Sequence, residues 1–120
     1  MRLRQVLKSK IHMGKVTNTV LEYGGSVGID SALLAASDML PGERVQVLNF
    51  NNGQRIETYI IGEEAGSGIV ALYGPAARCA QAGDRVSIIS YLFADDEEIK
   101  KLASKTIVLD ESNRIKGEQR

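Results

Sequence analysis

Pro41–Val47 reads PGERVQV, and a closely related segment, AGDRVSI, returns at Ala82–Ile88. Each segment has a glycine, an acidic residue, an arginine and a valine in that order, then one variable position and an aliphatic residue. A glycine before an acidic residue favours a turn, and the alternation that follows favours a strand. The same turn and strand used twice in one short chain predict a β-barrel with pseudo-two-fold symmetry. Chance is the alternative, because glycine–acid turns precede many strands.

Strand patterns extend outward from these two segments. Arg44–Phe50 alternates and is rich in β-forming residues, Asn51–Gly53 is a hairpin turn signal, and Arg55–Ile61 is expected to be the returning strand. Further extended segments are expected at residues 11–17, 20–23, 27–29, 69–73, 85–93 and 106–109, and another turn at residues 65–68. The chain is therefore expected to be mainly β.

Two short helices are expected between the strands. Asp30 can cap a helix that runs through Ala36, because its side chain can accept the free amide hydrogens of the first turn. Asp95–Glu98 opens the second helix and places acidic side chains at the positive end of the helix dipole. The tail from Glu118 is expected to fray.

The composition is that of one domain spanning residues 1–120, since 43% hydrophobic residues suffice for a single core. Fifteen basic and fifteen acidic side chains give a net charge of zero, which argues against nucleic acid as a partner because phosphate binding needs a basic excess. No apolar run approaches the roughly 18 residues of a membrane span, and the N-terminus lacks the apolar core of a signal peptide. We therefore expect a cytoplasmic protein with no membrane partner.

Single copies of cysteine and histidine limit the chemistry further. Cys79 cannot form an internal disulfide or a cysteine metal cluster, and it is expected to be a small buried hydrophobic residue. His12 has no partner motif, so it is expected to be structural and no metal site is expected.

Four separated motifs occur in the order and spacing of one enzyme family. They are KIH at Lys10–His12, YGGS at Tyr23–Ser26, NNGQRIETY at Asn51–Tyr59 and GPAAR at Gly74–Arg78. On these motifs the chain resembles the aspartate 1-decarboxylase family from about residue 4 to residue 113. The resemblance implies a six-stranded double-psi β-barrel with short peripheral helices and a homotetrameric assembly. It also implies a lyase that converts L-aspartate to β-alanine and CO2 for pantothenate biosynthesis.

The resemblance also implies an inactive proenzyme that cuts itself between Gly25 and Ser26, so that a covalent pyruvoyl group derived from Ser26 replaces pyridoxal phosphate as the electron sink. The Ser26 hydroxyl would attack the Gly25 carbonyl, and the resulting ester would eliminate to dehydroalanine, which hydrolyses to the pyruvoyl group and ammonia. A glycine before the serine removes bulk at the attacked carbonyl. The new ketone would form a Schiff base with the substrate amine. Without the family match, Gly24–Ser26 would be an ordinary turn.

The resemblance assigns roles around the new cofactor. Tyr59 matches the proton donor for the product carbanion, although a tyrosine on a strand is more commonly a core residue with a tethered hydroxyl. Lys10 and Arg55 match the cations that face the substrate. A cation on the departing carboxylate would stabilise the ground state more than the transition state, so we assign Arg55 to the carboxylate that is retained.

Thr58 matches the residue that supports cleavage by a hydrogen bond to the carbonyl of the scissile bond. Simple alternation would point Thr58 away from Tyr59, so a bend or bulge would be needed to bring both into one site. Gly74, Pro75 and Ala76 match the loop that lines the substrate site.

Three departures from the family pattern carry further expectations. Tyr73 stands where the family usually has asparagine, Pro75 where it has alanine, and Gly24 where many relatives have a larger residue. Pro75 removes a backbone N–H that could have bound substrate. The Tyr73 ring is expected either to turn outward or to crowd the Gly24–Gly25 turn, and crowding predicts slow self-processing.

Two alternatives stay open. The same chemistry could act on another small amino acid such as glutamate, or the chain could be a non-catalytic or unprocessed barrel that serves in assembly or binding. Maturation could be autonomous or could require a helper protein.

Overall fold

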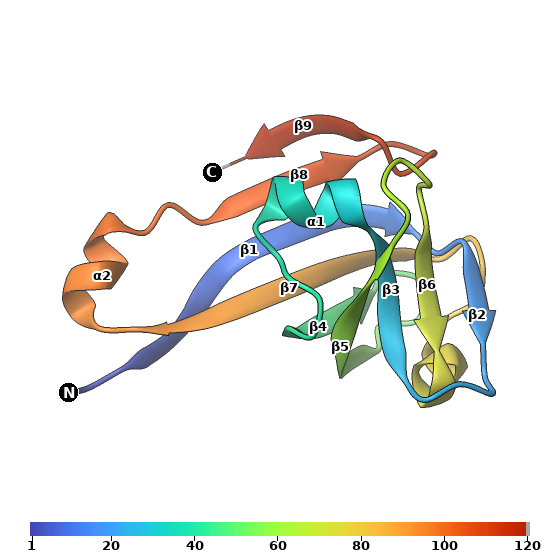
Figure 1. Cartoon of the computed structure of the whole chain (residues 1–120), viewed down its shortest axis with the longest axis horizontal. Coiled ribbons are helices and arrows are strands. Elements are labelled where there is room, and N and C mark those ends of the chain that lie inside the picture. The colour runs from blue at the N-terminus through green and yellow to red at the C-terminus, as the bar shows by residue number, and fades with distance from the viewer. Residues whose placement is uncertain (120) are drawn as a thin grey trace.

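Nine strands and three short helices make up residues 1–119, the part of the chain that this computed structural model describes (Figure 1). The strands are β1 (Arg4–Lys15), β2 (Asn18–Val20), β3 (Ser26–Asp30), β4 (Arg44–Asn49), β5 (Arg55–Glu63), β6 (Val70–Tyr73), β7 (Arg85–Ala94), β8 (Lys105–Leu109) and β9 (Ile115–Gln119). The helices are α1 (Ser31–Ser37), the 3₁₀ helix η1 (Gly74–Cys79) and α2 (Asp96–Lys101). The expected mainly β class is confirmed.

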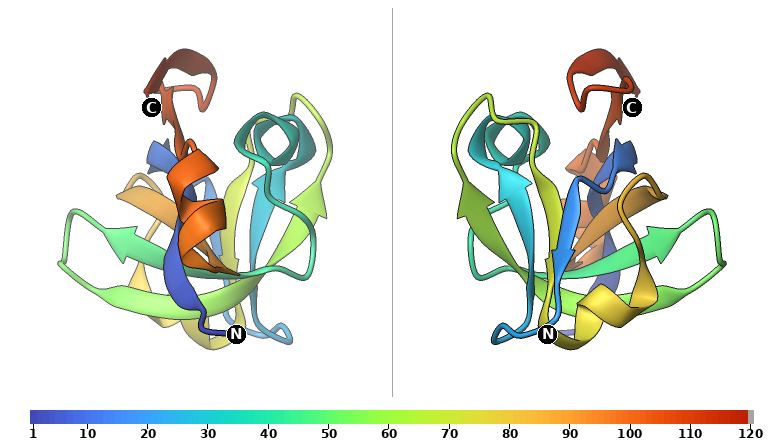
Figure 2. Two further views of the ribbon diagram at one scale, coloured as in Figure 1. Left: turned by 90° about the vertical axis from the view of Figure 1, so that its left-hand side faces the viewer. Right: turned by 90° about the vertical axis from the view of Figure 1, so that its right-hand side faces the viewer.

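The strands pair in the order β2-β6-β3-β5-β4-β7-β1-β8-β9. Three of these pairs are parallel, namely β1 with β8, β2 with β6 and β3 with β5, and the others are antiparallel. Within residues 1–119 the pairing forms a continuous series from β2 to β9 rather than a closed ring. The end-on views nevertheless show the strands curving around a common interior (Figure 2).

The two related sequence segments have the same backbone structure. Gly42–Glu43 exchanges two backbone hydrogen bonds with Ile60, of 2.7 and 3.0 Å, and Gly83–Asp84 exchanges two with Val16, of 2.8 and 2.9 Å. Both glycines have a positive φ, of 87° and 95°, which a residue with a Cβ rarely adopts. In both turns the acidic side chain accepts the backbone amide three residues before it, at 3.1 and 3.0 Å. The repeat is therefore structural, and the two strands that follow, β4 and β7, pair with each other.

The core lies between these strands and is built from aliphatic side chains. Its fully buried members include Ile11, Val27, Ile29, Ile60, Leu72, Val86 and Ile88. Helix α1 closes one side of this core with Leu33 and Leu34. Cys79 is only half-buried, so the expectation of a fully buried thiol is wrong.

Asp30 caps α1 as predicted and also holds the turn that precedes β6. Its carboxylate accepts the backbone amide of Ala32 at 2.8 Å, that of Gly66 at 3.0 Å and that of Gly68 at 2.9 Å. Burial alone would raise the pKa of Asp30, but the backbone amides outweigh burial and hold that pKa below its ordinary value of 3.8. The buried charge thus ties a helix and a turn together.

Several boundaries differ from the predictions because they depend on partners distant in sequence. β1 begins at Arg4 rather than at residue 11, since it pairs with β7 along nearly its whole length. The predicted extended stretch 20–23 ends at Val20, and the chain bends from residue 21 to residue 24. Glu118, expected to fray, lies in β9, which pairs with β8. The 3₁₀ helix η1 was not predicted, although Pro75 at its start favours such a turn.

Candidate active site

Ser26 is the first residue of β3 and is 0% exposed. Its hydroxyl is the one buried side-chain N or O atom in residues 1–119 that has no hydrogen-bond partner. β3 is held on one side by β5 and on the other by β6, where Ser26 lies opposite Tyr73. A buried polar group without a partner costs free energy, and a role in catalysis is one explanation for such a group. The structure thus singles out the predicted serine.

The turn before Ser26 touches a second loop backbone to backbone. Gly25 has φ +110° and Gly74 has φ +68°, values that favour glycine. A Cβ added at Gly74 would lie 2.7 Å from the Cα and N atoms of Gly25 and 2.8 Å from the carbonyl oxygen of Tyr23. Gly74 is therefore the residue that lets the start of η1 pack against the predicted scissile junction.

A pocket of about 410 Å³ opens beside this junction. It brings together the 24–25 turn, residues 56–59 of β5 and helix η1, and its lining residues are Gly24, Gly25, Ile56, Glu57, Thr58, Tyr59, Pro75, Ala76 and Cys79. Five residues that were predicted as site residues are among them. Two other predicted residues adjoin the pocket without lining it: Ser26 comes directly after Gly25 and is buried, and Gly74 packs against the Gly25 backbone.

Thr58 and Tyr59 both line this pocket although β5 has no bulge at that point. The register of β5 with β4 is continuous from Tyr59 to Arg55, and exposure alternates along it, with Tyr59 exposed and Thr58 half-buried. The expected need for a bend or bulge is therefore wrong. β3 pairs with β5 only from Ile60 onward. Residues 56–59 therefore have an edge that β3 leaves unpaired, and side chains of both faces line the pocket there.

Tyr59 does not have the environment of a core tyrosine. It is 46% exposed, and within residues 1–119 its hydroxyl makes no hydrogen bond. The alternative of a buried ring with a tethered hydroxyl is wrong, and the phenol is free to face a ligand.

The two predicted cations lie outside this pocket. Arg55 is exposed on the outer face of β5, and its Nη1 donates to the side-chain oxygen of Gln46 at 2.9 Å. The register places Lys10 three strands away from Glu57 through the directly opposed pairs Lys10–Ile89, Ile89–Gln46 and Gln46–Glu57. With strands about 4.8 Å apart, the path along the curved sheet from Lys10 to Glu57 is about 14 Å. One chain alone therefore does not bring Lys10 to the pocket.

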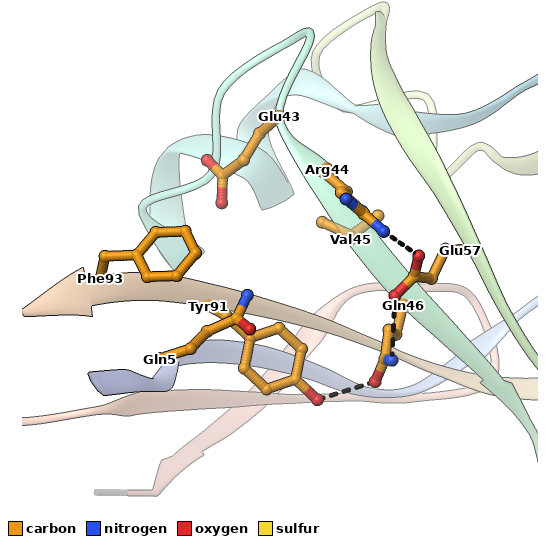
Figure 3. Close-up of a pocket in the computed structure, with 8 residues that line it drawn as sticks. All are labelled: Gln5, Glu43, Arg44, Val45, Gln46, Glu57, Tyr91 and Phe93. Atoms are coloured by element: carbon orange, nitrogen blue, oxygen red, sulfur yellow. Dashed lines mark hydrogen bonds and ion pairs between the residues drawn. The ribbon is translucent and has the colours of Figure 1, made fainter. Parts of the chain in front are cut away.

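A second hollow, of about 550 Å³, lies on this outer face (Figure 3). Its lining residues are Gln5, Glu43, Arg44, Val45, Gln46, Glu57, Tyr91 and Phe93. Dashed lines in the figure mark the ion pair of Arg44 with Glu57 and the hydrogen bonds that meet at Gln46. Glu57 lines both hollows, so the two adjoin along β5.

Tyr73 neither turns outward nor crowds the Gly24–Gly25 turn. Its hydroxyl donates to a carboxylate oxygen of Glu63 at 2.7 Å, and a Cβ added at Gly28 would lie 2.7 Å from its ring. Burial, followed by the bond to the charged Glu63, raises the pKa of Tyr73 to about 12. Within 4 Å of a Cβ added at Gly25 only Pro75 is found. The ring lies over β3 beyond Ser26 and packs on the ring of Tyr23, with centroids 4.7 Å apart, so it contacts the residue before the Gly24–Gly25 turn and not the turn itself.

Sequence reasoning missed Gln46, Glu57 and Glu63. Gln46 could have been found from the predicted hairpin, because pairing around the Asn51–Gly53 turn puts it opposite Glu57 and diagonal to Arg55. Glu63 could not, since its contact with Tyr73 spans three strands.

Residues 1–119 hold no group of three or more His, Cys, Asp or Glu side chains that could bind a metal ion. None of the helices in this part of the chain is long and apolar enough to cross a membrane. His12 lies away from the pocket, with Nδ1 2.9 Å from the Ser87 hydroxyl and its ring edge-on to Phe50.

The fold and the site define a class of protein: a small, mainly β enzyme domain in which a buried serine follows a glycine turn beside an open pocket. The family model described as "Aspartate decarboxylase" matches residues 1–116. The chain therefore belongs to the aspartate decarboxylase family.

Named relatives agree with this assignment over most of their length. The chain is similar to an aspartate 1-decarboxylase of Listeria monocytogenes serovar 1/2a, with 54% identity over 112 residues, which cover 93% of this chain and 88% of the relative. It is 50% identical to the aspartate 1-decarboxylase of Thermoanaerobacter pseudethanolicus, over 92% of this chain and 95% of the relative. The aspartate 1-decarboxylase of Carboxydothermus hydrogenoformans is 49% identical, over 92% of this chain and 87% of the relative.

Proposed function

We propose that this chain decarboxylates L-aspartate to β-alanine and CO2, the β-alanine serving pantothenate biosynthesis, after it cuts itself between Gly25 and Ser26. The observation that carries the proposal is the buried, unpartnered hydroxyl of Ser26, which follows a glycine turn at the pocket. The relatives named above support the substrate, since each is an aspartate 1-decarboxylase.

Self-cleavage uses groups of the chain itself. The Ser26 Oγ attacks the carbonyl carbon of Gly25, and the acyl group moves from nitrogen to oxygen. The ester then loses the Gly25 carboxylate by elimination across the Cα–Cβ bond, and hydrolysis of the dehydroalanine releases ammonia and leaves a pyruvoyl group. Thr58 lines the same pocket as Gly25 and hydrogen-bonds the carbonyl oxygen during the attack. Because no group of residues 1–119 engages the Ser26 hydroxyl, no hydrogen bond to them must break before it attacks.

The residues present fit the pyruvoyl group. Ser26 is the precursor and is buried in the uncut chain, and the packing of Gly74 against Gly25 leaves no room for a side chain between the two loops. The group, once formed, supplies the electron sink that no amino-acid side chain offers. Neither pyridoxal phosphate nor a metal has a role in this proposal.

The surrounding side chains bind the substrate and move one proton. The free phenol of Tyr59 gives its proton to the carbon from which CO2 has left. Arg55, on the outer face of β5 that adjoins the pocket, holds the carboxylate that is retained, while Pro75 and Ala76 line the pocket and Gly74 packs against Gly25. Lys10 faces the substrate as the second cation.

We also propose that the site is completed in a homotetramer. Lys10 lies about 14 Å across the sheet from the wall of the pocket within one chain, by the strand spacing given above. Large apolar side chains are exposed on the described chain, among them Val20, Leu21, Tyr23 and Phe50. Such exposure favours burial against further copies. The protein is proposed to work in the cytoplasm, with autonomous or helper-dependent maturation.

Mass spectrometry and a substrate panel test this proposal together. Denatured protein should give two pieces, residues 1–25 and 26–120, and the larger should lack a free amine at its start. The processed protein should release CO2 from aspartate faster than from glutamate, glycine or alanine. A single uncut mass after prolonged incubation, alone or with a cell extract, would overturn the proposal and favour a non-catalytic barrel. If the chain cuts itself but prefers another amino acid, the proposed cleavage stands and only the proposed substrate is wrong.

A further inference from the structure

We propose that Gln46 is a positioning residue that holds the Arg55 guanidinium in place for the retained carboxylate of the substrate. The inference deepens the proposed function and rests on the role given there to Arg55. It concerns the outer face of the sheet, where β4 lies between β5 and β7 (Figure 3).

The side-chain amide of Gln46 is oriented by three partners. Its oxygen accepts from Arg55 Nη1 at 2.9 Å and from the Tyr91 hydroxyl at 2.8 Å, while its nitrogen donates to Glu57 at 3.4 Å. Arginine can only donate, so the amide oxygen must face Arg55. The amide nitrogen then faces the Glu57 carboxylate. The Gln46 amide thus lies between a cation and an anion, with its oxygen toward Arg55 and its nitrogen toward Glu57.

This arrangement leaves the charge of Arg55 and most of its N–H donors available to a substrate carboxylate. Glu57 lies two residues along β5 on the same face and could pair with Arg55, but it forms an ion pair with Arg44 instead. Within residues 1–119 Arg55 makes no ion pair, and Gln46 uses one of its five N–H donors. A neutral acceptor therefore orients the guanidinium without cancelling its charge. A carboxylate at position 46 would cancel it.

Tyr91 gives the arrangement its rigidity. It lies on β7, is half-buried, and fixes the Gln46 oxygen from the side opposite to β5. An exposed arginine otherwise samples many rotamers, and ordering it during binding would weaken affinity. Because Gln46 orders the Arg55 side chain before the substrate binds, that entropy cost is smaller, and loss of Gln46 should weaken substrate affinity.

The experiment compares Gln46→Leu and Gln46→Glu with the wild-type protein and with Gln5→Leu. Gln5 lines the same hollow and makes no side-chain hydrogen bond within residues 1–119, so its replacement by leucine is a matched control. Gln46→Leu should raise the KM for aspartate about tenfold, as expected for one hydrogen bond to a charged group, and change kcat much less. Gln46→Glu should raise KM further, because its carboxylate competes with the substrate for Arg55. Self-cleavage, measured by mass, should proceed in all variants.

Succinate provides a readout that does not need turnover. It carries two carboxylates and no amine, so its dissociation constant, measured by calorimetry, reports carboxylate contacts alone. That constant should rise in parallel with KM in both Gln46 variants and stay unchanged in Gln5→Leu. An effect of Gln46→Leu no larger than that of Gln5→Leu overturns the inference.

An Arg55→Leu variant separates this inference from the proposed function. If Arg55→Leu weakens aspartate and succinate binding but Gln46→Leu does not, the role of Arg55 stands and the role of Gln46 fails. If Arg55→Leu has no effect on either ligand, the assignment of Arg55 fails and the inference falls with it.

Discussion

Ser26 differs from the other buried polar residues of the described chain because its hydroxyl has no hydrogen-bond partner. The remaining buried side-chain N and O atoms of residues 1–119 have partners, so the exception coincides with the residue that the family motif marks. At this scale, the motif predicted where the chemistry lies but not its surroundings. Gln46 could have been found from the predicted hairpin, but Glu63 carried no signal in the chain order, because its contact with Tyr73 depends on which strands become neighbours.

Ser26 and Tyr59 should separate maturation from catalysis. Ser26→Ala should abolish both cleavage and turnover, because no hydroxyl remains to attack. Tyr59→Phe should still cut itself but lose most decarboxylation, by about a hundredfold or more, since only the proton donor is removed. Intact mass reports cleavage and CO2 release reports turnover. Full turnover in Tyr59→Phe would reassign the proton donor.

Gly74→Ala should slow self-cleavage. The new Cβ would lie 2.7 Å from the Gly25 backbone at a position with φ +68°, so the scissile junction must shift, and the strain should cost about 1–3 kcal/mol of stability. Gly24→Ala is the matched control, because a Cβ there meets nothing within 4 Å. The rate at which the uncut mass disappears checks both variants. Equal rates in the two would contradict the close packing of the loops.

Tyr73→Asn should reduce the loss of thermal stability that Gly28→Ala causes, and it should not accelerate self-cleavage. The Tyr73 ring and the Glu63 carboxylate, each with an atom 2.7 Å away, share the space that a Cβ at Gly28 would need. Gly28→Ala should therefore lower the melting temperature in the wild-type background and lower it less beside Tyr73→Asn. Thermal unfolding of the four proteins forms a double-mutant cycle. A marked gain in cleavage rate from Tyr73→Asn alone would show that the ring does hinder the junction.

At the scale of elements, the sequence predicted a helix or turn correctly where it depends on residues that are close together in the sequence. The α1 cap at Asp30 and the hairpin around Asn51–Gly53 were predicted, because each depends on residues a few positions apart. The capping box of α2, formed by Asp95 and Glu98, follows the same rule. The first half of β1 and all of β9 were missed, since their polar residues form strands only against β7 and β8.

Asp30 predicts a pH dependence at this scale. Its pKa is lower in the folded than in the unfolded state, so the ionised carboxylate stabilises the fold above its unfolded pKa. That contribution is lost as the pH falls from about 3.8 through the lower folded value. Asp30→Asn should lower the free energy of unfolding at pH 7 by about 1–3 kcal/mol, and the difference from wild type should shrink below pH 3.8.

Urea unfolding at several pH values checks this expectation. Asp38→Asn is the control, because Asp38 has φ 58°, a conformation that asparagine adopts as readily. A pH-independent difference between wild type and Asp30→Asn would show that the charge of Asp30 is not the stabilising feature.

At the scale of the whole molecule, the proposed homotetramer would bring Lys10 to the pocket from a second subunit. If the site is shared between subunits, Lys10→Ala and Tyr59→Phe should each be poorly active alone. Co-expressed in one oligomer, they should regain activity, because about a quarter of the sites would take an intact Lys10 from one subunit and an intact Tyr59 from another.

The two variants are co-purified through different tags, and light scattering reports their assembly. A tetramer with restored activity is expected. A fully active monomer, or co-assembled variants with no more activity than either parent, would place the whole site within one chain.

The place of β1 in the sheet has a consequence for the molecularity of unfolding. β1 lies between β7 and β8, and β2 pairs with β6, so residues 1–25 stay bound after a cut at residue 25. A processed protein that unfolds then releases two separate peptides, and its melting temperature depends on protein concentration. Diluted denatured fragments must find each other before one subunit can fold, whereas each Ser26→Ala chain can fold as one piece before it assembles. Processing would thus make refolding a second-order reaction.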